Sequence, residues 1–281
     1  MSVQIMVAIH NASPGTGTFA LATSWAQRLN GAILAMGVVD ESTAVPASVL
    51  AGGSASMGNI AVPDADGLRT KAEKYVAEAM RELESHCRDA GVACRQVAKE
   101  GNPEEAICLE AQRCDIVVLG RQSTPNPDFG IPTREILSGI LRHSPRPVVA
   151  VPGHIQPGQG ILVAYDGSLQ SARALQALVA TGLRRLGTIL VVGVHPESEQ
   201  VANEHAERAV EYLAAHGLAV DRRIVVSDKS VECVIADEVQ AGGVEMIVMG
   251  AYGRSRLAEF FLGSTTTKVM DGVPAPVFLF H

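Results

Sequence analysis

The sequence predicts an α/β fold formed twice: two tandem, doubly wound, five-stranded parallel sheets. Short runs of β-branched and apolar residues alternate with longer stretches of helical periodicity, which is the pattern of strand–helix–strand units. The runs are apolar throughout rather than alternating, and strands of this kind are buried on both faces, as in parallel sheets covered by helices. The same series of segments occurs twice along the 281 residues, so two copies of one domain are predicted.

Four pairs of matching segments define the repeat. They follow one another in the same order: Gln4–Ile9 with Gly160–Tyr165, Gly31–Val38 with Gly187–Val194, Asp115–Gly120 with Glu245–Gly250, and Pro145–Val151 with Pro274–Phe280. The separation falls from 156 positions (4 to 160) to 130 (115 to 245), so the first copy holds about 26 extra residues, placed in a Gly/Ser/Ala-rich loop around 41–63. The Pro- and Gly-rich stretch 152–160 is the linker, which gives domains 1–152 and 153–281.

The elements of the second copy can be placed in order. Strands are expected at 160–165, 187–194, 219–226, 245–249 and 276–280, and helices at 168–185, 197–216, 230–241 and 264–271. In the first helix, Ala172, Leu175, Leu178 and Val179 recur at helical spacing. Ligands of doubly wound sheets bind beyond the carboxyl ends of the strands, so the residues that follow each strand are the place to look for a site.

Composition argues against several classes of function. A net charge of −7 disfavours a broad nucleic-acid surface, and no apolar run reaches the roughly 18 residues of a membrane helix. The five cysteines form no C-x-x-C pair and no zinc-finger spacing, and no signal-peptide pattern opens the chain, so a reduced, cytoplasmic protein without a metal site is expected. Cys108 and Cys233 lie in apolar helical patterns and are expected to be buried.

Two strand ends in the second copy carry candidate ligand-binding residues. The strand at 160–165 is followed by Asp166, whose carboxylate can accept hydrogen bonds from a base amine or a ribose hydroxyl, and by Ser168, a suitable helix N-cap. Alternatively, Asp166 only caps the turn. After the fourth strand, glycines permit close backbone approach, and a helix N-terminus with hydroxyl side chains suits phosphate; the residues are Gly250, Tyr252, Gly253, Arg254, Gly263, Ser264 and Thr265. Arg254 and Arg256 either reach outer phosphates or are ordinary surface residues.

The spacing G-x-x-G, nine residues, then G-[ST] resembles the ATP-binding signature of the universal stress protein family, and Gly250, Gly253, Gly263 and Ser264 fit it. The resemblance covers nearly the whole chain as two domains. It implies an adenine nucleotide α-hydrolase-like sheet of order 3-2-1-4-5 and bound ATP, or ADP or AMP, with Mg²⁺. The implied contacts are Asp166 and Val194 at adenine, with Ala164 and Tyr165 beside them, Met249 and Gly250 at ribose, and Gly253, Gly263, Ser264 and Thr265 at the phosphates. The pattern includes no essential nucleophile or base, so no catalytic residue is assigned, and any hydrolysis or self-phosphorylation would be slow and incidental.

The first copy departs from this pattern. His10 stands in the place of Asp166, Ser123 replaces the second glycine, and Arg134 falls near the place of Gly263. Prolines stiffen the loop and remove N–H donors: Pro125, Pro127 and Pro132. We therefore expect no ATP binding of the family's kind in this copy, which leaves a pseudo-site, a structural half or a site for another ligand.

A second nucleotide motif is rejected. Gly15, Gly17 and Ala20, with Asp40 after the next strand, imitate the dinucleotide fingerprint. However, Gly15 lies beyond the tight turn that follows the first strand, and the second copy lacks these glycines. No Gly-Lys-[Ser/Thr] occurs, which excludes a P-loop.

Three functions follow from these observations. The expected one is a nucleotide-dependent regulatory protein of the stress response; the alternatives are a slow ATPase or phosphotransferase, and a partner-binding scaffold without nucleotide. The apolar last strands, 147–151 and 276–280, can pair within the chain as a pseudo-dimer, as single-domain members of the family pair between chains. A homodimer of the whole chain and an unidentified protein partner stay open.

Overall fold

The fold is that of a computed structural model, which describes residues 2–10, 16–40, 65–121, 133–252 and 263–281. The extra stretch expected at 41–63 lies outside these residues. In the described part of the chain, no helix is long and apolar enough to span a bilayer.

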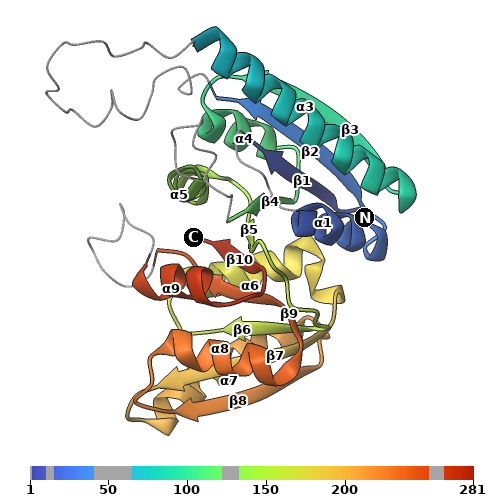
Figure 1. The fold of residues 1–281 in the computed structure, drawn as a ribbon. Coiled ribbons are helices and arrows are strands. Elements are labelled where there is room, and N and C mark those ends of the chain that lie inside the picture. The colour runs from blue at the N-terminus through green and yellow to red at the C-terminus, as the bar shows by residue number, and fades with distance from the viewer. Residues whose placement is uncertain (1, 11–15, 41–64, 122–132, 253–262) are drawn as a thin grey trace, which may run out of the picture.

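Ten strands form a single sheet in the order β3-β2-β1-β4-β5-β10-β9-β6-β7-β8 (Figure 1). The first half supplies β1 (Gln4–Ile9), β2 (Ala32–Val39), β3 (Ala93–Glu100), β4 (Ile116–Gly120) and β5 (Val148–Val151). The second half supplies β6 (Gly160–Ala164), β7 (Thr188–His195), β8 (Val220–Val226), β9 (Val244–Gly250) and β10 (Val277–Phe280). Neighbours within each half are parallel and follow the order 3-2-1-4-5, which confirms the predicted fold.

The two halves join edge to edge. Strand β10 pairs antiparallel with β5, in the register Val277↔Ala150, Phe278↔Val149 and Leu279↔Val148. All of these residues are buried. The expected pairing of the two last strands, and with it the pseudo-dimer, is confirmed.

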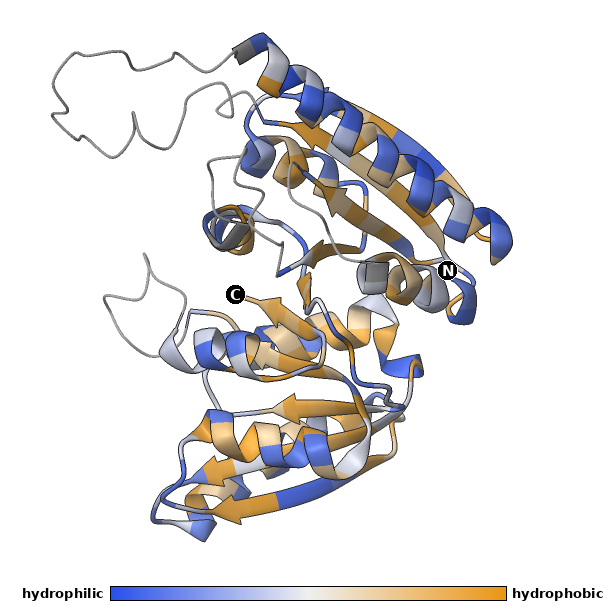
Figure 2. Cartoon of the chain, in the orientation of Figure 1, coloured by the Kyte–Doolittle hydropathy of each residue, from blue (hydrophilic) through white to orange (hydrophobic). Residues whose placement is uncertain are grey.

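Helices cover both faces of the sheet. One face carries α1 (Thr16–Arg28), α3 (Ala65–Asp89), α6 (Leu169–Thr181) and α7 (Glu199–Ala215); the other carries α4 (Pro103–Ala111), α5 (Thr133–His143), α8 (Val231–Gly242) and α9 (Ser264–Gly272). Each face has one hydrophobic core that includes residues of both halves, for example Trp25 with Leu175, and Ile140 with Val269. Figure 2 shows that the central strands are mostly apolar and that the helices, α3 above all, carry many polar residues. The halves are therefore joined by shared cores as well as by β5 and β10.

The edge strands differ from the expected all-apolar pattern. Strand β3 exposes Arg95, and β8 exposes Asp221 and Arg222. These two strands lie at the ends of the sheet, where each has a neighbour on only one side. Charged side chains on such edges oppose pairing with a second sheet.

The helix expected at 168–185 ends earlier. Helix α6 stops at Thr181, Gly182 adopts φ +77°, and a short 3-10 helix, η2 (Leu183–Arg185), follows. A glycine in the left-handed conformation is a common helix stop because it lacks the Cβ that makes this conformation costly.

The prediction that Cys108 and Cys233 are buried is wrong. Cys108 is half-buried and Cys233 is exposed, whereas Cys87 and Cys114 are buried. Helix α8 turns Val234, Ile235 and Val239 to the core, and Cys233 lies beside this stripe rather than within it. The apolar pattern identified the helix but not which side of it faces the sheet.

Candidate functional site

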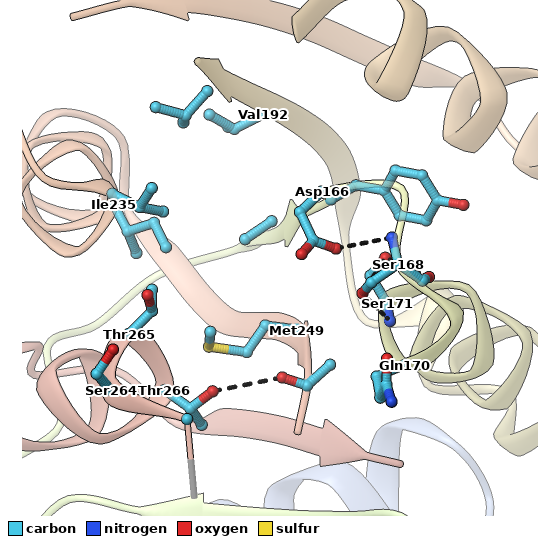
Figure 3. Close-up of a pocket in the computed structure, with 16 residues that line it drawn as sticks. Asp166, Ser168, Gln170, Ser171, Val192, Ile235, Met249, Ser264, Thr265 and Thr266 are labelled. Atoms are coloured by element: carbon cyan, nitrogen blue, oxygen red, sulfur yellow. Dashed lines mark hydrogen bonds between the residues drawn. The ribbon is translucent and has the colours of Figure 1, made fainter. Parts of the chain in front are cut away.

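A cavity of about 350 Å³ opens at the carboxyl ends of β6, β7 and β9, beside the first turns of α6 and α9 (Figure 3). We call it the second-half cavity. It brings together most of the residues predicted for the site: Ala164, Tyr165, Asp166, Val194, Met249, Gly250, Gly263, Ser264 and Thr265. Sequence reasoning did not assign the remaining lining residues to the site: Ser168, Gln170, Ser171, Val192, Val231, Ile235 and Thr266. The volume is within the range of small-molecule sites.

Asp166 lies at the mouth of the cavity on the turn between β6 and α6. Its Oδ1 accepts the N–H of Ser168 at 3.0 Å, and Ser168 in turn caps α6 by accepting the N–H of Ser171 at 3.2 Å. The turn needs Gly167, which has φ +73° and lies so close to the ring of His205 that an added Cβ would be 2.9 Å from Cδ2. Asp166 therefore organises the turn and also presents its carboxylate to the cavity, since a carboxylate can accept several hydrogen bonds.

One wall of the cavity is apolar. Val192 and Val194 come from β7, Met249 from β9, and Val231 and Ile235 from α8. Residues two apart on a strand share a face, so Val192 could have been inferred from Val194. Residues four apart on a helix also share a face, but only the fold brings α8 to this wall. A flat ring with apolar faces, such as a purine, suits such a surface.

Another side of the cavity is the N-terminus of α9, which lies beside Ile235 (Figure 3). Gly263 is its N-cap, no described side chain caps the first turn, and no acidic residue lies in that turn. Ser264 is exposed, Thr265 is half-buried, and Thr266 Oγ1 donates to the Gly250 carbonyl at 3.4 Å (Figure 3). Uncapped N–H groups and the positive end of the helix dipole favour an anion at this position.

Gly250 lines the cavity, but packing alone also requires a glycine there. A Cβ on Gly250 would lie 2.6 Å from the Ser171 nitrogen and 2.7 Å from the Gln170 carbonyl carbon. The first turn of α6 therefore approaches the end of β9 at a distance that only glycine permits. The glycine was expected to permit close approach of a ligand, and the structure shows close approach of α6.

Of the three other predicted residues, only Tyr252 is described, and it does not line the cavity. Tyr252 is buried elsewhere: its hydroxyl donates to the Ser138 carbonyl of α5, in the first half, at 2.8 Å. Gly253 and Arg254 lie outside the described residues, as does Arg256.

Charge in the cavity is concentrated at one point. Asp166 is the only Asp, Glu, Lys, Arg or His residue of the described lining. Burial raises the pKa of the neighbouring Tyr165, an effect opposed by Arg208 and supported by Asp166, so this phenol stays neutral. No cluster of three or more His, Cys, Asp or Glu residues that could hold a metal occurs among the described residues.

The equivalent place in the first half is chemically different. His10 is buried, and burial lowers its pKa to about 4, against the opposing effect of the Asp40 charge. A neutral, buried imidazole thus stands where the second half has an exposed carboxylate. The loop with Ser123 and the three prolines lies outside the described residues, as does the side chain of Arg134.

Comparisons with known proteins agree with this architecture. The sequence matches the family described as "Universal stress protein family" in two blocks, residues 1–152 and 159–281. It is 26% identical over 179 residues to a universal stress protein of Synechocystis sp., a match that covers 62% of this chain and 61% of the relative. It is also 28% identical over 132 residues to one from Thermus aquaticus, covering 42% of this chain and 96% of the relative.

Among solved structures, a universal stress protein from Archaeoglobus fulgidus has the same fold, with a TM-score of 0.67 at 18% identity. The likeness covers 98% of this chain and 95% of that one. Two family matches that together span nearly the whole sequence, on a tandem fold, establish what the repeat and the glycine spacing indicated. The chain belongs to the universal stress protein family, in its tandem two-domain form.

Proposed function

We propose that the second-half cavity binds an adenine nucleotide, with ATP as the expected ligand, and that the chain acts as a nucleotide-dependent regulatory protein in the stress response. One observation carries the proposal. A single cavity joins a carboxylate at one strand end to an uncapped helix N-terminus, with an apolar wall between them. A nucleotide has the same order of groups: a polar-edged ring, a sugar and an anion.

The proposed binding mode follows this order. Val194 and Ile235 contact the faces of the base, and Asp166 accepts hydrogen bonds from the base amine or a ribose hydroxyl. The ribose lies along Met249 and Gly250. The phosphates lie at the N-terminus of α9, where Gly263, Ser264 and Thr265 offer N–H and hydroxyl donors.

In the proposed complex, Mg²⁺ is bound by the phosphates of the nucleotide. The donor set at α9 consists of N–H and hydroxyl groups, which fit phosphate oxygens. The hydroxyls of Ser264 and Thr265 are suitable second ligands for a cation that the nucleotide carries, because Mg²⁺ prefers oxygen and keeps several waters.

The lining supports binding rather than turnover. In the described lining, no His, Cys, Lys or Glu accompanies Asp166, so no described base other than this aspartate is available to activate the hydroxyls of Ser264 and Thr265 as nucleophiles. Nucleotide occupancy, rather than its hydrolysis, is then the signal that the protein gives to a partner.

The test begins with the nucleotide content of the purified protein, released by denaturation and separated by ion exchange. Calorimetry with Mg·ATP on nucleotide-free protein follows. We expect about one nucleotide per chain, and Asp166→Ala should weaken binding by about 10-fold or more, the effect of a hydrogen bond to a charged group. Asp221→Ala, which removes an exposed carboxylate from edge strand β8, is the matched control and should change nothing.

Other outcomes contradict the proposal in different ways. Two nucleotides per chain would show that the first half also binds. A protein that is purified empty and gives no heat with Mg·ATP is a scaffold without nucleotide. Phosphate release that persists through repurification and is lost in Asp166→Ala would instead make the chain a slow ATPase.

A further inference from the structure

We propose that the first half positions the phosphate side of the second-half cavity, through Tyr252 and Arg121. The inference rests on the proposed nucleotide binding and adds its structural control: a half that lacks the aspartate of the site would still set how tightly the phosphates are held. Neither residue touches the cavity. Both are positioning residues. Arg121 acts through α9, and Tyr252 acts through the end of β9, where the Gly250 carbonyl accepts a hydrogen bond from Thr266 in the first turn of α9.

Tyr252 fixes the end of β9. It follows Gly250, which lines the cavity, by two positions, and it is only 8% exposed. Its backbone has φ +59°, a left-handed conformation that is strained for a tyrosine and persists only where the surroundings impose it. The surroundings are the hydroxyl bond to the Ser138 carbonyl of α5, at 2.8 Å, and an edge-to-face contact with the ring of His281, whose centroid is 6.1 Å away.

Arg121 fixes the other element, α9. It follows β4 directly, and its Nη2 donates to the carbonyl of Val273, the residue that caps the C-terminus of α9. The Nε and Nη1 atoms of the same guanidinium are buried and have no hydrogen-bond partner among the described residues. Burial also lowers the pKa of Arg121 to about 10, although the Asp271 charge opposes this, so the group remains charged at neutral pH. A hydrogen bond donated by a charged guanidinium is stronger than one between neutral groups, so the contact with Val273 is expected to hold α9 in place.

The two contacts are counterparts across the pairing of β5 and β10. Arg121 follows the fourth strand of its half and reaches the helix that precedes β10. Tyr252 follows the fourth strand of the other half and reaches the helix that precedes β5. Helix α9 has only nine residues, and its N-terminus is the proposed phosphate site. A short helix moves as one body, so a displacement at Val273 also displaces Ser264 and Thr265 at the other end of α9.

The base side of the cavity is farther from the first half. In the sheet, β9 is the second strand from β5, whereas β6 and β7, which present Asp166 and Val194, are the third and fourth. We therefore expect the contacts of Tyr252 and Arg121 to affect binding of the phosphates and not binding of the base. A general loss of stability would weaken binding of both parts of the nucleotide.

The experiment compares adenosine with Mg·ATP, by calorimetry on the full chain. Tyr252→Phe and Arg121→Met each remove one contact, and each should weaken ATP binding by about 3- to 10-fold, the effect of one hydrogen bond, with adenosine binding unchanged. Amide hydrogen exchange within α9 should also speed up in unliganded Arg121→Met. The exchange readout needs no ligand.

Matched controls exist for both variants. Arg28 also crosses to the second half, where it donates to the Leu186 carbonyl and to Glu245, at the opposite end of β9. Arg28→Met should lower the melting temperature without changing ATP binding relative to adenosine. Tyr212 also contacts a histidine ring, that of His216, but lies on α7 outside the cavity, and Tyr212→Phe should have no effect.

Equal weakening of adenosine and ATP, or no weakening of either, would overturn the inference while the proposed function stood. Normal exchange in α9 of Arg121→Met would also count against it. If the wild-type protein binds neither ligand, the proposed function fails, and the inference fails with it.

Discussion

Trp25 of α1 donates its indole N–H to Oε1 of Glu245, at 2.6 Å, and so joins the first half of the chain to the start of β9 in the second. Trp25 is fully buried and Glu245 is only 8% exposed. Arg28, one turn further along α1, donates to the same oxygen at 2.5 Å. This charge-assisted pair of bonds lies at the opposite end of β9 from the second-half cavity, so it can stabilise the fold without taking part in the site.

Trp25→Phe should therefore destabilise the whole chain. The change removes a hydrogen bond to a buried carboxylate, and we expect the free energy of unfolding to fall by roughly 1.5–3 kcal/mol. Urea denaturation followed by circular dichroism measures it. Because the halves share both cores, the transition should stay single, and a variant that unfolds in two steps would contradict the shared-core description.

His10 makes stability depend on pH. Its folded pKa, lowered to about 4, is below its unfolded value near 6.5, so between these values the unfolded chain binds a proton that the folded chain does not. Stability from this group is complete above pH 6.5 and declines as the pH falls towards 4. This difference in pKa predicts that the free energy of unfolding falls by about 2 kcal/mol between pH 7 and pH 5.

His10→Asn tests that linkage. Urea unfolding at pH 7 and pH 5 should show a smaller difference in the variant than in the wild-type chain. Other groups, such as His281, contribute equally to both proteins and cancel. An equal pH dependence in the two proteins would mean that His10 already titrates normally in the folded state.

Local patterns made the fold predictable, and long-range contacts were not predictable. Strands and helices follow from the spacing of apolar residues, and the last strands were expected to pair because both are apolar edges. By contrast, Trp25 and Glu245 are separated by 220 positions, and no periodic signal links them. The same reason explains Tyr252: the motif placed it between two site glycines, but its hydrogen bond is to Ser138, 114 positions away. Val231 and Ile235 were recognised as helical but not as part of the cavity wall, since this depends on how α8 docks beside β7 and α9.

Cys233 should be the thiol that reacts first. It is exposed, whereas Cys87 and Cys114 are buried, and burial raises the pKa of Cys114 to about 11. The pKa values of the two half-buried thiols are also raised, that of Cys108 to about 11 by burial and Glu104, and that of Cys94 by its interaction with Cys87 and by burial, which leaves little thiolate at pH 8. Titration of the native protein with an aromatic disulfide should show one fast equivalent, and Cys233→Ser should remove it. A fast phase that survives in Cys233→Ser would contradict the prediction, because another thiol would then react as fast as the exposed one.

Gly250→Ala should affect both stability and binding, because Gly250 belongs to the packing and to the cavity at once. The added methyl would lie 2.6 Å from the Ser171 nitrogen and 2.9 Å from Gln170 Cβ, so the first turn of α6 has to move away. We expect a loss of about 1–3 kcal/mol in the free energy of unfolding, the effect of overpacking, together with weaker ATP binding, because Ser168 and Asp166 move with α6. Gly272→Ala is the control, since a Cβ there meets no atom within 4 Å among the described residues. If Gly250→Ala retained full stability and lost only ATP affinity, the glycine would serve the ligand rather than the helix, and the packing explanation given for it would be wrong.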